Sequence, residues 1–237
     1  MQSPMWAPGL HRSHPLANGL VGLWPMWDGD GDKAMDLVDG NGGTLVGGAT
    51  WAATEKGGVL DFNGSTAGLS LPSTLTGATE FTMAGWINAR GAFNTDVIWE
   101  HSANFNGSTG SFIVFLTSGE LRVSRKTATY YNGGNRADFG NGWRHLAVTW
   151  SEVTDGSLCE RVWYDGIEQA VTPTHTDATT GVAVPVQTLY MATRATASLH
   201  LNCQLGPQAA WNRALSPGEI QQLYVEPHAL TRYKRLV

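Results

Sequence analysis

Apolar and polar residues alternate with a period of two through much of the chain from residue 59 onward. In the stretch FTMAGWI, Phe81, Met83 and Ile87 fall on one face, whereas Ala84 and Trp86 fall on the other. Successive side chains of a β-strand point to opposite faces of its sheet, so this period is typical of strands. The stretch therefore predicts a strand with two partly apolar faces.

The same alternation recurs in later segments. In WRHLAVTW, Leu146, Val148 and Trp150 share one face, and His145 and Thr149 point the opposite way. SFIVFL, GELRVS, CERVWYDG and TLYMAT continue the pattern between clusters of Gly, Asn, Ser and Thr. Such strands suit a sheet that packs on a second sheet and is covered on its other face by loops or another molecule. We predict an all-β sandwich of two antiparallel sheets.

Tight turns and one helix complete the expected fold. FLTSGELRV reads as strand, turn, strand, and Asp165-Gly166 is an Asp-Gly hairpin signal. In LSPGEIQQLY, Ser216 can cap a helix that starts at Pro217, and Glu219 can complete a capping box. Pro227 is expected to end this short C-terminal helix.

Composition agrees with this fold class and limits which kinds of partner are expected. The 237 residues include 29 Gly and ten Trp, and only 15% are charged, which favours many strands joined by turns. One domain is the default at this length. A net charge of −5 disfavours nucleic acid as a partner, because such binding needs a concentrated basic face. The exception is the end, HALTRYKRLV, which has three cations and no acid.

Targeting signals and cysteines give little information about the function of the protein. The start, MQSPMWAPGLHRSHPLANGL, has no charged beginning followed by roughly 7–15 apolar residues, so we expect no export by the usual route. No segment approaches the roughly 20 apolar residues that span a bilayer, and we expect no membrane partner. Cys159 and Cys203 can form one disulfide or none, and free buried thiols are expected in a reducing cytosol.

Six motifs occur in a characteristic order: GLVGLWPMWDGDG with MDLVDGNGGTLVGGATW, GGVLDFNGST, FTMAGWI, WRHLAVTW, VWYDG and WNRALSPGEIQQLY. Over roughly residues 17 to 225 the chain resembles the laminin-G-like domains of the concanavalin-A-like lectin and glucanase superfamily. The resemblance implies a jelly-roll sandwich of two curved antiparallel sheets. It agrees with the strands expected from the alternation.

The two ends resemble the flanks of laminin-G-like proteins encoded by bacteriophages and prophages. These are RSHPLANGLVGLW and EIQQLYVEPHALTRYKRLV. We therefore divide the chain into an N-terminal arm (1–16), a jelly-roll domain (17–225) and a basic tail (226–237). The hypothesis is a non-enzymatic virion protein that decorates a phage capsid in many copies, with the major capsid protein as partner.

In this hypothesis the two arms attach the protein to its neighbours. Apolar anchors would supply burial, and basic residues would set orientation by charge complementarity. The arm residues are Met5, Trp6, Leu10, His11, Arg12, Leu230, Arg232, Lys234 and Arg235.

An acid-rich stretch raises the question of calcium. Asp28, Asp30, Asp32 and Asp36 lie in WDGDGDKAMDLVDGNGG, but Lys33 stands where an EF-hand needs glycine, and no amphipathic helices flank the loop. A metal ion held by these four carboxylates is one alternative, and solvated turn formation is the other. The family resemblance implies a different calcium site, at positions that here hold Thr66, Ala67 and Gly206, none of which is an acid.

Catalytic signatures are missing from the sequence. Glycosidases need two carboxylates that flank the scissile bond, and superfamily glucanases carry them as Glu-x-Asp-x-x-Glu, a pattern that this chain lacks. There is also no Gly-x-Ser-x-Gly elbow and no phosphate loop. We expect no enzymatic activity.

The alternative function is glycan binding as a lectin-like adhesion module. Tyr130, Tyr131, Asn132 and Asn135 fall in TATYYNGGNRADFGNGW, a predicted loop, and combine aromatic faces with amides. Further aromatic residues, Trp99, Trp163 and Trp211, lie on or near predicted strands, where tryptophan usually serves as core.

Overall fold

The structure is a computed structural model, which describes residues 6–55, 57–105, 107–118, 120–127, 131–137, 139–155 and 157–235. For residues 6–8, 131–137 and 233–235 it describes the backbone alone.

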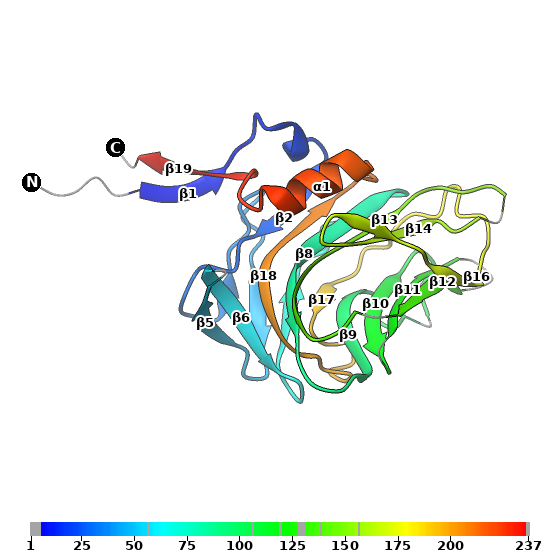
Figure 1. Cartoon of the computed structure of the whole chain (residues 1–237), viewed down its shortest axis with the longest axis horizontal. Helices are drawn as coiled ribbons and strands as arrows, with labels where there is room; N and C mark the ends of the chain where they lie inside the picture. The colour runs from blue at the N-terminus through cyan, green and yellow to red at the C-terminus, as the bar shows by residue number, and fades with distance from the viewer. Residues whose placement is uncertain are drawn as a thin grey trace, which may run out of the picture.

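The described residues form two large antiparallel sheets that pack face to face (Figure 1). The nine-stranded sheet has the order β16 (Thr172–His175), β12 (Tyr131–Ala137), β11 (Glu120–Lys126), β10 (Phe112–Thr117), β9 (Asn94–His101), β17 (Leu189–Met191), β7 (Gly68–Leu71), β4 (Gly43–Val46) and β3 (Lys33–Ala34). The eight-stranded sheet has the order β15 (Ile167–Gln169), β14 (Glu160–Tyr164), β13 (Gly142–Trp150), β8 (Phe81–Ala89), β18 (Asn202–Trp211), β6 (Gly57–Asn63) and β5 (Thr50–Thr54), with β2 (Leu20–Trp24) also paired to β18. The predicted jelly-roll sandwich is confirmed.

The main core lies between the sheets and follows from the alternation in the sequence. Phe81, Met83 and Ile87 of β8 point inward, as do Leu146 and Val148 of β13, and all five are buried. The register pairs β8 with β13 over their whole lengths. Apolar side chains from both sheets thus form one core, and the predicted faces of both strands are confirmed.

The predicted hairpin and helix are also present. Asp165 and Gly166 both have positive φ, 53° and 78°, which suits the two-residue turn that joins β14 to β15. Helix α1 spans Pro217–Val225. Its capping box joins Ser216 and Glu219 in both directions, with Pro217 in the first turn, as expected.

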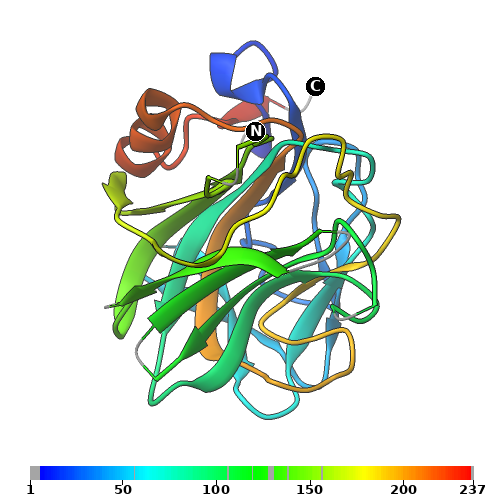
Figure 2. The ribbon, with the colours of Figure 1, turned by 90° about the vertical axis from the view of Figure 1, so that its right-hand side faces the viewer.

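A second hydrophobic cluster lies on the outer face of the eight-stranded sheet. Helix α1, the 3-10 turn η1 (Pro15–Ala17) and the segments next to the two termini gather at one end of the sandwich (Figure 2). Ile220 and Leu223 of α1, together with Leu10 and Leu16, are buried in this cluster. The packed body therefore includes part of the segment 1–16 that was predicted as an arm.

The two ends of the chain pair with each other. Strand β1 (Trp6–Leu10) runs antiparallel to β19 (Thr231–Arg235), from Trp6 opposite Arg235 to Leu10 opposite Thr231. This terminal ribbon projects away from the sandwich in Figure 1.

One predicted loop is a strand. Residues 131–137 form β12, which pairs with β11 and β16. The segment YNGGNRA contains Gly and Asn, which are depleted in strands, and has no apolar alternation. Its extended form is set by the hydrogen bonds of its two neighbours, which local sequence does not reveal.

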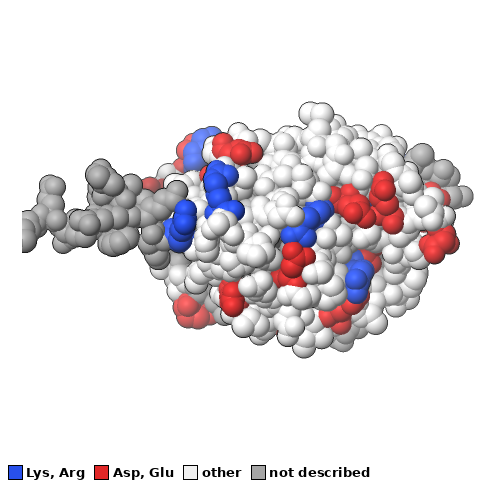
Figure 3. Space-filling view, turned by 90° about the horizontal axis from the view of Figure 1, so that it is seen from above, with Lys and Arg blue, Asp and Glu red and all other residues white. Residues whose placement is uncertain are grey.

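Charge is mixed over the face of the molecule that Figure 3 shows. In the space-filling view of Figure 3, Lys and Arg side chains lie among Asp and Glu side chains, with much uncharged surface between them. None of the helices in the described part of the chain has the length and apolar character needed to cross a membrane.

Candidate functional site

The outer face of the eight-stranded sheet has two unlike halves. The covered half lies under α1 and the terminal segments, and its buried residues include Ala84, Ala147, Trp163, Ala209 and Trp211. The open half lies further along the same strands, and we define it by Asp61, Trp86, Asn88, Trp143, Gln204 and Gly206.

Pairing of the strands brings polar residues of the open half into a row. Asp61, Gln204, Asn88 and Trp143 stand opposite one another on the neighbouring strands β6, β18, β8 and β13. Asn88 Nδ2 donates to Gln204 Oε1 at 3.0 Å, and Gln204 Nε2 donates to Asp61 Oδ2 at 2.8 Å. These bonds fix the orientation of both amides, and they leave other amide donor and acceptor positions for a ligand.

Arg90 closes one end of this row. Its Nη1 and Nη2 donate to the two Asp61 oxygens at 3.1 and 2.8 Å, and Nη2 also bonds the Phe62 and Cys203 carbonyl oxygens at 3.2 Å. A bidentate arginine–carboxylate pair is strongly directional. The carboxylate that orients Gln204 is therefore held in place and its charge is balanced.

Two half-buried indoles stand beside the row. A Cβ added at Gly206 would lie 3.2 Å from Trp86 Cβ and 3.6 Å from Trp143 Cζ3, so both tryptophans approach this glycine, from strands on the same side of β18. A larger residue there would crowd both side chains. Trp86 also packs on His145 and Tyr224, with ring centroids 5.5 and 5.8 Å away.

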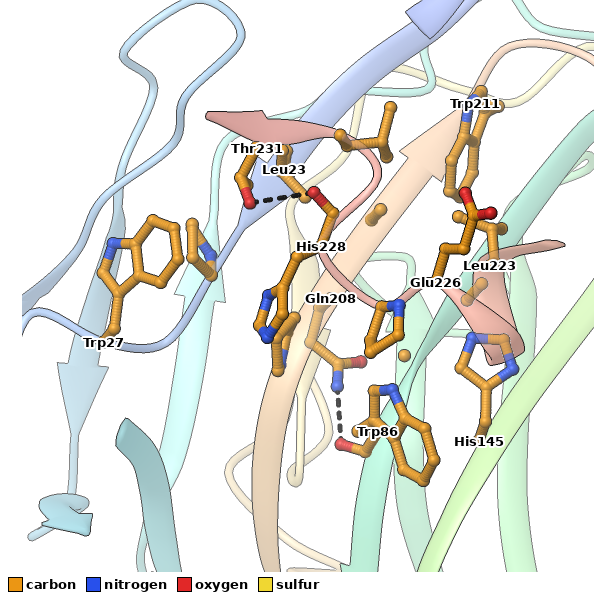
Figure 4. Close-up of a pocket in the computed structure, with 17 residues that line it drawn as sticks. Leu23, Trp27, Trp86, His145, Gln208, Trp211, Leu223, Glu226, His228 and Thr231 are labelled. Carbon is orange, nitrogen blue, oxygen red and sulfur yellow. Dashed lines mark hydrogen bonds between the residues drawn. The ribbon is translucent and has the colours of Figure 1, made fainter. Parts of the chain in front are cut away.

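A narrow crevice joins the open half to the C-terminal segment (Figure 4). Trp86, His145 and Gln208 lie on its sheet side, and His228 and Thr231 on the other. Its volume is about 40 Å³, room for little more than one water molecule. A neighbouring groove of about 140 Å³ lies between Trp86, Pro207, Glu55, Pro227 and His228. The open half thus continues into a groove with an aromatic floor.

Hydrogen bonds hold the crevice in shape. Gln208 Nε2 donates to the Trp86 carbonyl oxygen at 3.0 Å, and Gln208 Oε1 accepts from Trp99 Nε1 at 3.0 Å. Thr231 Oγ1 donates to the His228 carbonyl oxygen at 3.1 Å. Burial lowers the pKa of His145 to about 4, so its ring is neutral at pH 7. The crevice therefore has no cationic histidine on its sheet side.

The predicted attachment residues divide between the body and the ribbon. Leu10 and Leu230 are 6% and 4% exposed, buried within the chain's own second cluster, and their role as anchors on a neighbouring protein stays a prediction. His11 N donates to the Leu230 carbonyl oxygen at 2.8 Å, and Arg12 Nη2 to that of Val38 at 2.9 Å. Arg232 lies in β19 opposite Gly9.

The other attachment residues can be placed only in part. Met5 lies outside the described residues, and for Trp6, Lys234 and Arg235 only the backbone of the ribbon is described.

The four aspartates of the candidate metal loop do different things. Asp36 is buried, and its carboxylate accepts from the backbone N–H groups of Leu23, Val38 and Asp39. Asp28 accepts from Met35 N, whereas Asp30 and Asp32 are exposed. Within the described residues, no group of three or more His, Cys, Asp or Glu side chains is placed to hold a metal ion.

The corner at which the resemblance implied a calcium site holds other bonds. Asn63 Oδ1 accepts from Ser65 N, Thr66 N and Ala67 N at 2.9 to 3.0 Å. Ala67 is buried, and Gly206 lies in the open half instead. The cysteines Cys159 and Cys203 are buried and free, and burial raises the pKa of both thiols.

The aromatic residues singled out from the sequence do not form the open half. Tyr130 lies outside the described residues, and Tyr131, Asn132 and Asn135 belong to β12 of the opposite sheet, with side chains that are not described. Trp99, Trp163 and Trp211 are all at most 1% exposed. Sequence reasoning missed the pair Trp86 and Trp143. The available signal was the alternation along β8 and β13. Trp86 and Trp143 occupy the strand faces opposite to those of the main-core residues.

Comparisons with known proteins agree with the fold. The sequence model of the concanavalin A-like lectin/glucanases superfamily matches residues 63–221. Among curated proteins no relative of this chain is found.

Solved structures share the architecture at low sequence identity. Domain 4 of the GH43 extracellular arabinanase from Geobacillus stearothermophilus, solved with arabinotriose, has a TM-score of 0.66 at 16% identity, over 86% of this chain and 98% of that one. Trypanosoma rangeli sialidase has 0.66 at 15%, over 89% of this chain, and the botulinum neurotoxin serotype D/C binding domain has 0.65 at 11%, also over 89%. The chain spans 33% of the sialidase and 52% of the toxin domain. At identities of 11 to 16% these similarities show a shared fold alone.

Proposed function

The chain belongs to the concanavalin A-like lectin/glucanases superfamily, and on this premise we propose that it is a non-catalytic binding module that takes a neutral glycan on its open half. One observation carries the proposal. Trp86 and Trp143 both approach Gly206, next to the oriented amides of Asn88 and Gln204.

The chemistry of this arrangement suits a sugar. One face of a pyranose or furanose ring is lined by C–H groups that pack on an aromatic ring, and its hydroxyl groups pair with amides. Asp61 holds Gln204, and Gln204 holds Asn88, before any ligand arrives. Preorganised groups lose less conformational entropy on binding, which favours affinity.

Charge supports a neutral ligand and the absence of catalysis. Among the six residues that define the open half the one carboxylate is Asp61, both of whose oxygens accept from Arg90, and Glu55 lines the neighbouring groove. Glycoside hydrolysis needs two carboxyl groups about 5 to 10 Å apart. An anionic sugar would gain little from Arg90, since that guanidinium is already paired. The arabinanase domain that shares this fold was solved with arabinotriose, which supports oligosaccharides as the class to test.

The test begins with an array of neutral and sialylated oligosaccharides, followed by calorimetric titration of the best neutral binder. Trp143→Ala is expected to weaken binding about tenfold or more, because aromatic truncation in a binding site commonly costs over 1 kcal/mol. Ile167→Ala, at a residue 69% exposed on β15, is the matched control and should bind like the wild type. Absence of binding across the array, or equal binding by Trp143→Ala, would refute the proposal.

The second candidate function is a structural protein of a phage virion, attached in many copies to the major capsid protein. The terminal ribbon favours it, since β1 and β19 place Arg232 and the backbone of Lys234 and Arg235 together beyond the body. Deletion of residues 1–9 and 232–237 should abolish incorporation into particles while the sandwich stays folded. Normal incorporation of that variant would rule this function out.

A further inference from the structure

A hollow on the outer face of the nine-stranded sheet is independent of the open half. Its volume is about 240 Å³. Strands β9, β10 and β11 supply Thr95, Ile113, Phe115 and Ser124, and loops supply Phe105 and Leu199. Ile113 stands opposite Ser124 in the sheet register, so these two residues lie side by side at the base.

A buried ion pair fixes one wall of the hollow. Glu100 is fully buried and accepts from Arg194 Nε at 3.2 Å and Nη2 at 3.3 Å. It also accepts from Ala195 N at 3.1 Å and Ser102 Oγ at 2.7 Å. Arg194 lines the hollow and is 20% exposed. The wall is therefore polar, while the charge of its guanidinium is balanced by Glu100.

Backbone strain marks the same place. Two of the lining residues have positive φ although neither is glycine: Thr95 at 102° and Leu199 at 53°. This region is unfavourable for β-branched and bulky residues, and it persists only where surrounding structure enforces it. The Leu199 carbonyl oxygen accepts from Val97 N at 2.9 Å, which ties the loop to β9. Strain of this kind gathers at ligand sites, and both strained residues line the hollow.

We propose that this hollow is a binding site for a small neutral ligand with one apolar ring and a carbonyl or hydroxyl oxygen directed at Arg194. Four lining residues are apolar: Phe105, Ile113, Phe115 and Leu199. The space equals about eight water molecules at roughly 30 Å³ each and lies below the roughly 300 Å³ of larger ligand pockets, which suits one substituted ring. Because Glu100 already balances Arg194, a neutral acceptor suits the wall better than a carboxylate.

The test uses phenylacetamide as the neutral probe and phenylacetate as its charged counterpart, with both titrations followed by protein NMR shifts. Phenylacetamide is expected to bind with a millimolar Kd and shift the resonances of Ile113 and Ser124. Phenylacetate is expected to bind at least fivefold more weakly. Absence of phenylacetamide binding up to its solubility limit would overturn the proposal, and so would equal binding of the two probes.

Variants separate this hollow from other surfaces. Ser124→Phe fills the hollow and should weaken phenylacetamide binding at least tenfold, whereas Val186→Phe, at a residue 75% exposed, adds the same ring elsewhere and should change nothing. Should Ser124→Phe fail to fold, Phe115→Ala replaces it and should also lose binding through the missing wall. Trp143→Ala should leave phenylacetamide binding intact. Unchanged binding by a folded Ser124→Phe or Phe115→Ala would refute the site.

Discussion

The covered and open halves of the eight-stranded sheet are built from the same strands but differ in how far their residues are buried. On β8, Ala84 is buried under the second cluster, and Trp86, two residues later, is half-buried at the edge of a groove. On β13, Ala147 is buried and Trp143 is half-buried. The difference lies in what covers the sheet, because α1 and the terminal segments bury one half, whereas in the open half they contact only its edge at Trp86.

The contrast separates stabilising tryptophans from binding tryptophans. Trp211 fills the covered half, and its Nε1 donates to the Leu16 carbonyl oxygen at 2.7 Å. Trp143 has part of its ring in solvent and stands next to a polar row. Exposed aromatic residues beside oriented polar groups are typical of binding surfaces, whereas buried ones serve packing.

Trp211→Ala is expected to give the largest effect. It creates a cavity in the covered half and leaves the Leu16 carbonyl oxygen without its donor, at a cost of about 3–5 kcal/mol in the free energy of unfolding. Urea unfolding followed by circular dichroism measures this. A loss below about 1 kcal/mol would mean that the covered half does not hold the terminal segments in place.

His145 lies at the border of the two halves and makes stability depend on pH. Burial lowers its pKa from 6.5 to about 4, so the unfolded chain takes up the proton first as pH falls. Through His145 the free energy of unfolding is therefore at its full value above pH 6.5. It falls by about 3 kcal/mol in all as the pH is lowered towards pH 4. His145→Gln should reduce the loss of unfolding free energy between pH 7 and pH 4, measured in urea. Parallel curves for both proteins would contradict the buried, neutral state of His145.

Ser216→Ala tests helix α1, which lies over the covered half of the sheet. It removes the side chain that caps α1 and should lower the free energy of unfolding by about 1 kcal/mol. Hydrogen exchange should quicken at the first turn of α1 and stay unchanged in Asn88 and Gln204. Faster exchange throughout the open half would show that the two halves are not independent.

Trp143→Ala should have the smallest effect on stability. Trp143 is partly exposed, so its loss is expected to change the free energy of unfolding by about 1 kcal/mol or less. Thermal unfolding alongside Trp211→Ala gives a direct comparison. A change as large as that of Trp211→Ala would assign Trp143 to the structure and not to binding.

The sequence predicted the elements better than their arrangement. Alternation in β8 and β13 and the capping box of α1 are local signals, and each was confirmed. The approach of Trp86 and Trp143 to Gly206 is non-local, since it depends on three strands far apart in the chain. The burial of Leu10 and Leu230 was missed for the same reason, because at the base of the terminal ribbon both pack on residues far away in the chain.

The most direct measurement follows the tryptophan indole N–H resonances during titration with the neutral oligosaccharide that binds best. Peaks are assigned by single substitutions. The account predicts that Trp86 and Trp143 shift with one shared Kd, while Trp163 and Trp211 of the covered half stay in place. Shifts confined to the covered half, or binding that moves none of the open-half indoles, would contradict the assignment of the glycan site.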